Sequence, residues 1–183
     1  GRVRALRDRK LRDAQTCYWI EGVRQFVQAF DAGLPFDTIV WSPILLKSDL
    51  AEKISRILKA QGVRRVRVTP EQFRSVHLAD RASGIGAIVR QHWTPLEQAV
   101  PTVGLAWVII EEIRNPGNLG TILRTAEATE ASGLICIGPN CDPFDPAVVR
   151  ASMGGMFHIP LIRTSCDELA AWCRQHSLHL VGL

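Results

Sequence analysis

The stretch Leu105-Ala-Trp-Val-Ile-Ile110-Glu-Glu-Ile-Arg-Asn115-Pro-Gly-Asn118-Leu-Gly120-Thr-Ile-Leu-Arg124-Thr-Ala126 decides the fold class. Residues 105–110 form a nearly continuous apolar run, as expected of a strand that is covered on both faces in a parallel sheet. The Asn-Pro-Gly-Asn sequence favours a tight turn, and Asn118 is a good N-cap for a helix over residues 118–131. The stretch therefore predicts a strand, a short loop and a capped helix.

The same alternation of strand and helix extends to both sides of this stretch. Helical periodicity predicts helices over the basic arm (residues 1–13) and over residues 23–30, 49–60, 146–152 and 167–176, with a short helix after Pro70. Aromatic and β-branched runs predict strands at residues 17–20, 38–41, 63–68, 85–89, 134–137 and 178–181. This alternation is typical of an α/β protein.

One loop-like stretch divides the chain. Between residues 92 and 103, Pro95 and Pro101 bracket a sequence that fits neither the helical nor the strand period. We therefore expect two domains, residues 1–98 and residues 99–183.

Composition excludes several classes of protein. The chain has 183 residues, of which 46% are apolar and 22% charged, as in globular domains and unlike disordered or fibrous chains. The longest apolar run has eight residues, far fewer than the roughly 20 of a membrane-spanning helix. No secretory or lipidation signal opens the chain, so we expect a cytoplasmic protein that does not enter the membrane.

Known catalytic and metal-binding patterns are missing. The five cysteines form no Cys-x-x-Cys pair, which indicates buried thiols and no metal site. No Gly-Lys dipeptide occurs, so there is no P-loop, and Gly84-x-Gly86 lacks the third glycine of a dinucleotide fingerprint. The stretch from Arg150 to Gly154 lacks the first glycine of a nucleophile elbow.

Charge is distributed unevenly along the chain. Residues 1–100 contain 17 Lys and Arg against 10 Asp and Glu, whereas residues 101–183 contain 5 against 8. Six of the cations lie in the arm, and three more, Arg64, Arg65 and Arg67, lie in one predicted strand. This asymmetry favours a polyanionic partner for the first half, although a run of charges is more often a solvated face.

Arg124 is the most conspicuous cation of the second half. Leu119, Ile122, Leu123 and Ala126 form the apolar stripe of the predicted helix, and Arg124 projects about 150° away from it. It is therefore either an ordinary solvated arginine or an anion ligand near the carboxyl end of a parallel strand, where ligands of α/β proteins bind.

The run from Asn115 to Ala126 resembles the first motif of the SpoU (TrmH-type) RNA ribose 2′-O-methyltransferases of the SPOUT superfamily. The later stretch Asp142-Pro-Phe-Asp145-Pro-Ala-Val-Val-Arg150-Ala-Ser152-Met-Gly154 resembles the next motif of that family. The basic arm, Trp19-Ile-Glu21-Gly22 and Ser83-Gly84-Ile85 are similar to its substrate-binding domain. The resemblance covers essentially the whole chain.

The resemblance implies a fold and an activity. The fold would be a ribosomal-protein-like α/β substrate-binding domain followed by the first part of a parallel-sheet, trefoil-knot methyltransferase domain. The activity would be the S-adenosylmethionine-dependent methylation of a ribose 2′-hydroxyl in ribosomal or transfer RNA by a homodimer. No general acid is required, because attack on the sulfonium methyl group releases a neutral thioether.

The resemblance also implies site residues. Arg124 and Asn118 would be catalytic: Arg124 would hold the target phosphate and stabilise the developing alkoxide, or abstract its proton, and Asn118 would orient Arg124 or the substrate. For Asn118 and Arg150 the alternatives are a helix cap and a solvated helix end. The RNA-binding residues would be Arg7, Arg9, Lys10, Arg12 and Arg150.

The chain departs from the family pattern at its carboxyl end. The Gly-x-Glu strand and the Ile-Pro-Met and Ser-Leu-Asn segments that form the family's cofactor site and knot do not occur before Leu183. We therefore expect a C-terminally truncated and inactive chain, in which Gly182 and Leu183 are the only cofactor contacts. The alternatives are a non-catalytic RNA-binding protein derived from this family and, less favoured, a Rossmann-like enzyme for small molecules.

Overall fold

The computed structural model describes residues 1–78, 81–101 and 105–182, which form two compact units. The first unit comprises Gly1–Gln91 together with Phe144–Arg150, and the second comprises His92–Pro143 and the chain from Ala151 onward. The predicted division at residue 98 thus lies seven residues after the observed one. The first unit also takes in a short segment from the second half of the sequence.

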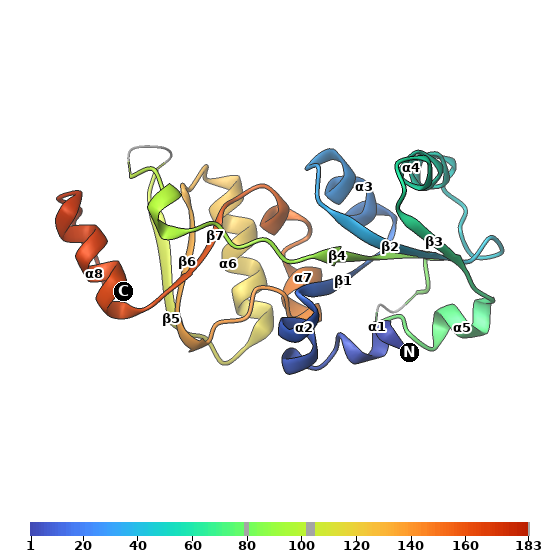
Figure 1. Cartoon of the computed structure of the whole chain (residues 1–183), viewed down its shortest axis with the longest axis horizontal. Coiled ribbons are helices and arrows are strands. Elements are labelled where there is room, and N and C mark those ends of the chain that lie inside the picture. The colour runs from blue at the N-terminus through green and yellow to red at the C-terminus, as the bar shows by residue number, and fades with distance from the viewer. Residues whose placement is uncertain (79–80, 102–104, 183) are drawn as a thin grey trace. The chain divides into compact units, whose positions relative to one another are not determined.

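The first unit is built on a four-stranded sheet (Figure 1). Its strands are β1 (Cys17–Glu21), β2 (Phe36–Trp41), β3 (Arg64–Arg67) and β4 (Ile85–Arg90), in the order β1-β4-β2-β3. β2 and β3 are parallel, and β4 is antiparallel to both β1 and β2. The sheet is thus bounded by β1 on one side and β3 on the other.

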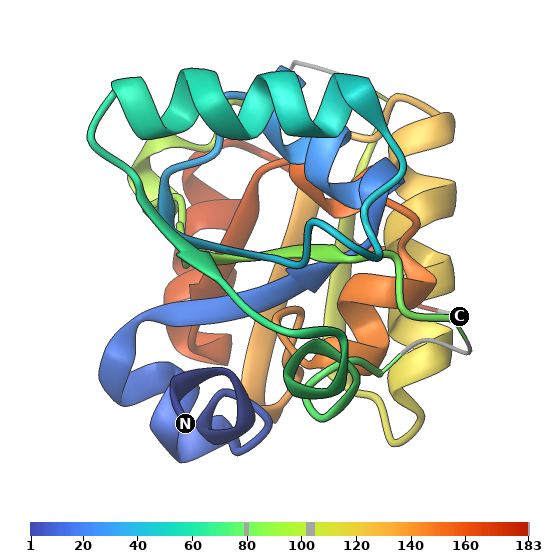
Figure 2. The ribbon, with the colours of Figure 1, turned by 90° about the vertical axis from the view of Figure 1, so that its right-hand side faces the viewer.

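Helices cover both faces of this sheet (Figure 2). α3 (Val23–Asp31) and α4 (Asp49–Ala60) lie on one face, and α1 (Arg2–Ala5), α2 (Arg9–Gln15) and α5 (Pro70–Arg74) lie on the other. α4 begins where the sequence predicts, because the Ser48 hydroxyl caps it by accepting a hydrogen bond from the Ala51 N–H at 3.2 Å. The core on the α1 face contains Leu6, Cys17, Trp19, Val40, Phe73 and Ile88.

The second unit has a parallel sheet of three strands, β5 (Trp107–Glu112), β6 (Gly133–Asn140) and β7 (Leu161–Thr164), in that order. α6 (Pro116–Ala128) covers one face, and α8 (Cys166–Gln175) packs on the other through Leu169 and Trp172 (Figure 1). The short 3-10 helices η1 (Leu96–Gln98) and η2 (Gly155–Phe157) lie in the connections. α7 (Pro146–Ala151) precedes η2 in the chain, and its residues up to Arg150 belong to the first unit.

The α/β class and most of the elements are confirmed, but the predicted strand at residues 178–181 is wrong. This segment has no regular secondary structure, and Leu180 and Val181 are exposed. The third strand of the parallel sheet is instead β7, which the sequence analysis did not identify. A strand requires a hydrogen-bonding neighbour, and it is β7 that pairs with β6. None of the helices in the described ranges is both long and apolar enough to cross a membrane.

Candidate active site

The loop between β5 and α6 ends in a helix cap formed by Asn115. Its Oδ1 accepts a hydrogen bond from the Gly117 N–H at 2.8 Å, and Pro116 occupies the first position of the helix. Proline is favoured there because its missing N–H would have no partner in the helix. The prediction that Asn118 caps the helix is therefore wrong: the cap lies three residues earlier.

Asn118 instead lies in the first turn of α6, with an exposed side chain. Its amide makes no side-chain hydrogen bond to any residue in the described ranges. Arg124 lies six positions further along the helix, which places the two side chains about 120° apart around the helix axis. Asn118 is thus free to contact a ligand, but the described contacts do not include one in which it orients Arg124.

Arg124 is exposed on α6 and is directed by one contact. Its Nη1 donates to the Met153 Sδ at 3.2 Å, and its other N–H groups make no hydrogen bond within the described part of the chain. Leu119, Leu123 and Ala126 are buried on the opposite side of the helix, as the stripe predicted. The guanidinium therefore retains most of its donors for an anionic ligand.

The turn that brings Met153 to Arg124 depends on two glycines. Met153 and Gly154 both have left-handed backbone conformations, with φ of 51° and 95°. A Cβ on Gly155 would lie 3.0 Å from the Arg124 Cα, a tighter contact than most Cβ atoms make, so glycine favours this close approach of η2 to α6. The sequence analysis did not assign Met153 or Gly155 to the site. The adjacent glycines after the helix over residues 146–152 were the available signal.

Two thiols face each other at β6: Cys136 lies within the strand, and Cys141 directly follows it. The Sγ atoms of Cys136 and Cys141 are 2.7 Å apart, and both residues are fully buried. The hydrogen bond between the two thiols and burial raise the pKa of Cys136 far above its ordinary value. Cys136 is therefore a neutral thiol at pH 7 and not a nucleophile.

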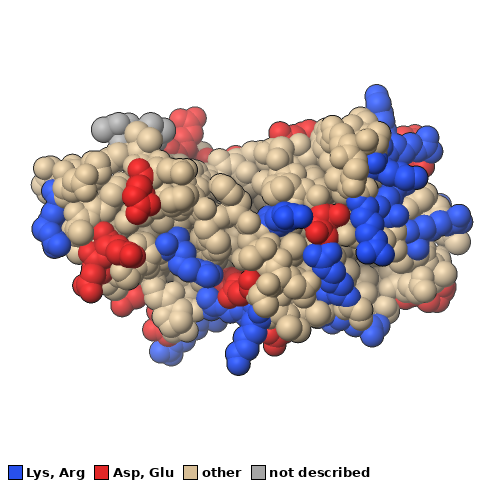
Figure 3. Space-filling model, viewed as in Figure 1, with Lys and Arg blue, Asp and Glu red and all other residues tan. Residues whose placement is uncertain are grey.

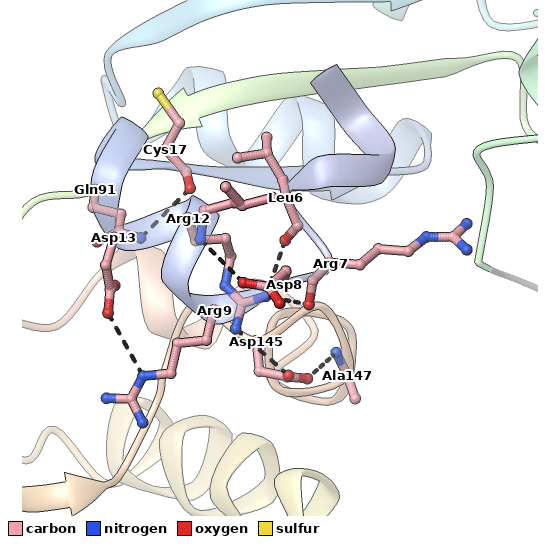
Figure 4. A network of polar contacts seen from close by, with 11 residues as sticks. Leu6, Arg7, Asp8, Arg9, Arg12, Asp13, Cys17, Gln91, Asp145 and Ala147 are labelled. Carbon is pink, nitrogen blue, oxygen red and sulfur yellow. Dashed lines mark hydrogen bonds and ion pairs between the residues drawn. The ribbon is translucent and has the colours of Figure 1, made fainter. Parts of the chain in front are cut away.

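Arg12 was predicted to bind RNA, and the structure shows that this prediction is wrong. Arg12 is 1% exposed, and its Nη1 donates to the carbonyls of Leu6 at 2.9 Å and Arg7 at 2.7 Å (Figure 4). Its Nη2 lies 3.7 Å from the carboxylate of Asp145, whose other oxygen accepts from the Ala147 N–H at 2.8 Å. Arg12 cannot reach an RNA phosphate from this position, because the fold itself encloses the guanidinium.

The other predicted RNA-binding residues remain at the surface. Arg7 and Arg150 each donate one N–H to a backbone carbonyl, Arg7 to Val76 at 3.3 Å and Arg150 to Leu78 at 2.7 Å. Arg9 lies 3.6 Å from Asp13, and Lys10 is exposed. The structure thus gathers these cations in the first unit, where all except Lys10 also bind other parts of the chain.

The predicted cofactor contacts lie at the end of the chain. Gly182 is exposed, and no atom lies within 4 Å of where its Cβ would be. Leu183 lies outside the described residues. Across residues 1–78, 81–101 and 105–182, no three His, Cys, Asp or Glu side chains are placed to hold a metal ion.

Two family models match this chain. Residues 106–183 match the SpoU rRNA Methylase family, and residues 2–87 match the MRM3-like substrate binding domain. The two matches together leave few residues uncovered, and the gap between them contains the observed boundary between the units.

Relatives with named activities resemble most of the chain. The 23S rRNA (uridine(2479)-2′-O)-methyltransferase of Streptomyces viridochromogenes is 26% identical over 85% of this chain and 54% of its own length. The mitochondrial rRNA methyltransferase 3 of Xenopus laevis is 29% identical over 90% of this chain and 39% of its own. The chain thus spans about half the length, or less, of these two relatives.

A solved structure has the same fold. The crystal structure of an AdoMet-bound rRNA methyltransferase from Sinorhizobium meliloti superposes with a TM-score of 0.85 at 32% identity. The superposition covers 94% of this chain and 64% of that protein.

Proposed function

Because this chain joins an MRM3-like substrate binding domain to a segment of the SpoU rRNA methylase family, we propose that it forms part of an S-adenosylmethionine-dependent rRNA ribose 2′-O-methyltransferase. The observation that carries the proposal is the exposed Arg124 on α6, which is held against Met153 and retains free donors. Arg124 lies within the motif by which the sequence resembles this family.

Arg124 acts in this proposal as a fixed cation. A guanidinium stays protonated at pH 7 and presents planar, paired donors that match a phosphate. The same charge stabilises the alkoxide that develops when the ribose 2′-hydroxyl loses its proton. Asn118 is the second proposed catalytic residue, and its unpaired amide supports a direct contact with the RNA.

S-adenosylmethionine supplies the methyl group in this proposal. The described residues do not enclose it: of the two predicted contacts, only Gly182 is described, and it is open to solvent. For the described residues, the proposal therefore concerns how the RNA substrate is held. Methyl transfer itself is proposed for the whole protein.

Finer features of the function are proposals as well. Ribosomal RNA is favoured over transfer RNA because the two named relatives act on rRNA. A homodimer is proposed from the family resemblance, and the exposed Leu105 offers the second unit apolar surface for it. A cytoplasmic location agrees with the five free cysteines. Arg7, Arg9, Lys10 and Arg150 remain proposed phosphate contacts.

The test is methyl transfer by the full-length protein that contains this chain. It is incubated with tritiated S-adenosylmethionine and 23S rRNA, and the modified nucleoside is identified after digestion. We expect label on a ribose 2′-oxygen and a loss of about 100-fold or more in kcat for Arg124→Ala. Arg124→Lys keeps the charge but not the paired donors, so we expect an intermediate rate.

Arg174→Ala is the matched control, because it removes an exposed arginine from α8 on the opposite face of the sheet. A normal rate for Arg124→Ala would contradict the assigned role. RNA binding without methyl transfer by the wild type would favour the non-catalytic RNA-binding protein instead.

A further inference from the structure

The outer strand β3 carries three arginines in four residues, Arg64-Arg65-Val66-Arg67. β3 pairs with β2 on one side only, and within the described residues no strand pairs with its other side. Alternate residues of a strand point to opposite faces, so Arg64 projects to one face of the sheet and Arg65 and Arg67 to the other. The arginines therefore surround an open edge.

These cations lack acidic partners. Arg64 and Arg67 are exposed and make no hydrogen bond or ion pair within the described residues. The acid whose charge acts on Arg65 is Glu52, and Glu52 already binds Arg56 at 2.7 Å. The positive charge of β3 is therefore largely uncompensated.

Arg65 is fixed by an aromatic ring. Its guanidinium carbon lies 3.7 Å from the ring centroid of Trp41 on β2, a cation–π contact. Its Nε and Nη2 are buried without a hydrogen-bond partner in the described structure. The ring therefore holds Arg65 against the sheet, whereas the side chains of Arg64 and Arg67 are exposed at the edge.

The surroundings of β3 strengthen the positive potential. Residues 47–74, which include α4, β3 and α5, contain eight Lys and Arg against three Asp and Glu. Figure 3 shows the blue side chains gathered over α4, β2 and β3. This segment alone exceeds the net charge of +4 of the whole chain.

The arm is the other basic segment of the unit, but within the described residues its cations, apart from Lys10, bind the protein itself. Arg2 pairs with Asp37, Arg4 donates to the Ser75 carbonyl at 3.3 Å, and Arg12 is enclosed. Together with the bond from Arg7 to Val76, the contacts of Arg2 and Arg4 link α1 and the residue Arg7 to β2 and to the residues after α5. The basic composition of the arm is thus mainly structural.

We propose that the β3 edge, defined as Arg64, Arg65 and Arg67 with Trp41, is the main RNA-phosphate contact of the first unit. This inference rests on the proposed function, which supplies RNA as the polyanion. Arg64 and Arg67 lie about 10 Å apart along the strand and flank its open edge from opposite faces, so an RNA backbone that runs along this edge can place separate phosphates beside them. Such contacts carry no base specificity and act through counterion release.

The experiment compares two double variants of the 183-residue chain that remove the same charge. Arg64→Ala/Arg67→Ala alters the β3 edge, and Arg4→Ala/Arg7→Ala alters the arm. Binding of a fluorescein-labelled RNA hairpin of about 30 nucleotides is measured by anisotropy at several salt concentrations. Thermal unfolding confirms that each variant is folded at the assay temperature.

We expect the β3 variant to bind roughly tenfold more weakly and to lower the slope of log K against log salt by about two. The arm variant is expected to change the slope by less than half as much. Arg64→Lys/Arg67→Lys, which keeps both charges, is expected to retain most of the wild-type slope. This third variant also tests the proposal if the alanine pair does not fold.

Equal losses in the two alanine variants, or a loss in the arm variant alone, would overturn the inference. It would also be overturned if the β3 variant kept its RNA affinity but lost self-association in sedimentation, because the edge would then pair with another copy. A wild-type chain that binds no RNA overturns it too, whereas failure of methyl transfer alone leaves RNA binding intact and affects only the proposed function.

Discussion

The two outer strands of the first sheet, β1 and β3, differ in what lies beside them. Residues 144–150 pack on the β1 side, where the ring of Phe144 contacts that of Tyr18 at a tilt of 45°, with ring centroids 4.9 Å apart. The Gln25 side chain donates to the Val149 carbonyl at 2.9 Å on the same side. β3 has no such cover in the described structure, and its residues Arg64 and Arg67 are exposed.

This difference separates two uses of arginine. Near β1, Arg12 is buried and satisfies the carbonyls of Leu6 and Arg7 together with the carboxylate of Asp145. At β3, Arg64 and Arg67 protect an open edge from pairing with other strands and remain available to an anion. A run of basic residues therefore indicates RNA binding only where the fold leaves the charges without internal partners.

The largest expected effect on stability concerns residues 144–150, which pack beside β1. Phe144→Ala removes a ring that is 2% exposed, so we expect a loss of about 4 kcal/mol in the free energy of unfolding. Urea denaturation followed by tryptophan fluorescence measures it. A loss below about 1 kcal/mol would mean that residues 144–150 contribute little to the first unit.

A second expected loss concerns Arg12. Arg12→Ala leaves two carbonyls and a carboxylate without their donor, and we expect a cost of about 3 kcal/mol in unfolding free energy. The neighbouring cation Lys10 is the control, since Lys10→Ala is expected to change stability by no more than about 0.5 kcal/mol. Equal effects of the two substitutions would show that the burial of Arg12 does not stabilise the fold.

The ion pair between Arg2 of the arm and Asp37 of β2 predicts a smaller, pH-dependent effect on stability. Burial raises the pKa of Asp37, but hydrogen bonds from Arg2 and Thr38 outweigh it and lower the pKa below its ordinary value. The carboxylate therefore stabilises the protein above pH 4, and this contribution is lost as the pH falls through the lowered pKa.

The substitution Asp37→Asn tests this ion pair. It is expected to cost about 1 kcal/mol at pH 7 and less at pH 2, because the contribution of the carboxylate falls as the pH falls through the lowered pKa. Chemical denaturation at both pH values measures the difference. If the loss of unfolding free energy in Asp37→Asn did not change with pH, it would result from altered packing and not from the lost charge.

The smallest expected effect on the stability of the chain comes from substitutions at the open edge of β3. Arg64→Ala/Arg67→Ala removes exposed side chains without internal partners, so the free energy of unfolding is expected to change by no more than about 0.5 kcal/mol. The measurement compares this change in unfolding free energy with that of Arg12→Ala. A loss as large as that of Arg12→Ala would mean that the β3 arginines are structural as well.

Local sequence determined most of the elements. The Ser48 cap and the apolar period that follows placed α4 correctly, and the apolar run at residues 105–110 gave most of β5. The motif around Arg124 also placed this residue on the exposed face of α6. These features depend on neighbours within one or two turns, which is why periodicity detects them.

The errors arose where the outcome depends on distant residues. Two short apolar segments near the carboxyl end look alike, and only pairing with β6 distinguishes β7 from residues 178–181. Asn115 and Asn118 flank the same Pro-Gly pair, and Pro116 at the first helical position decides for Asn115. Arg12 is buried because Asp145, 133 residues later in the chain, lies beside it.

The most direct test of this contrast is to map where RNA lies on the chain. The 183-residue chain is irradiated with ultraviolet light in complex with the RNA hairpin, and the nucleotide adducts are located by mass spectrometry after digestion. We predict adducts at Trp41 and in residues 64–67. Adducts confined to residues 2–13 and 144–150 would contradict the assignment of the β3 edge to RNA.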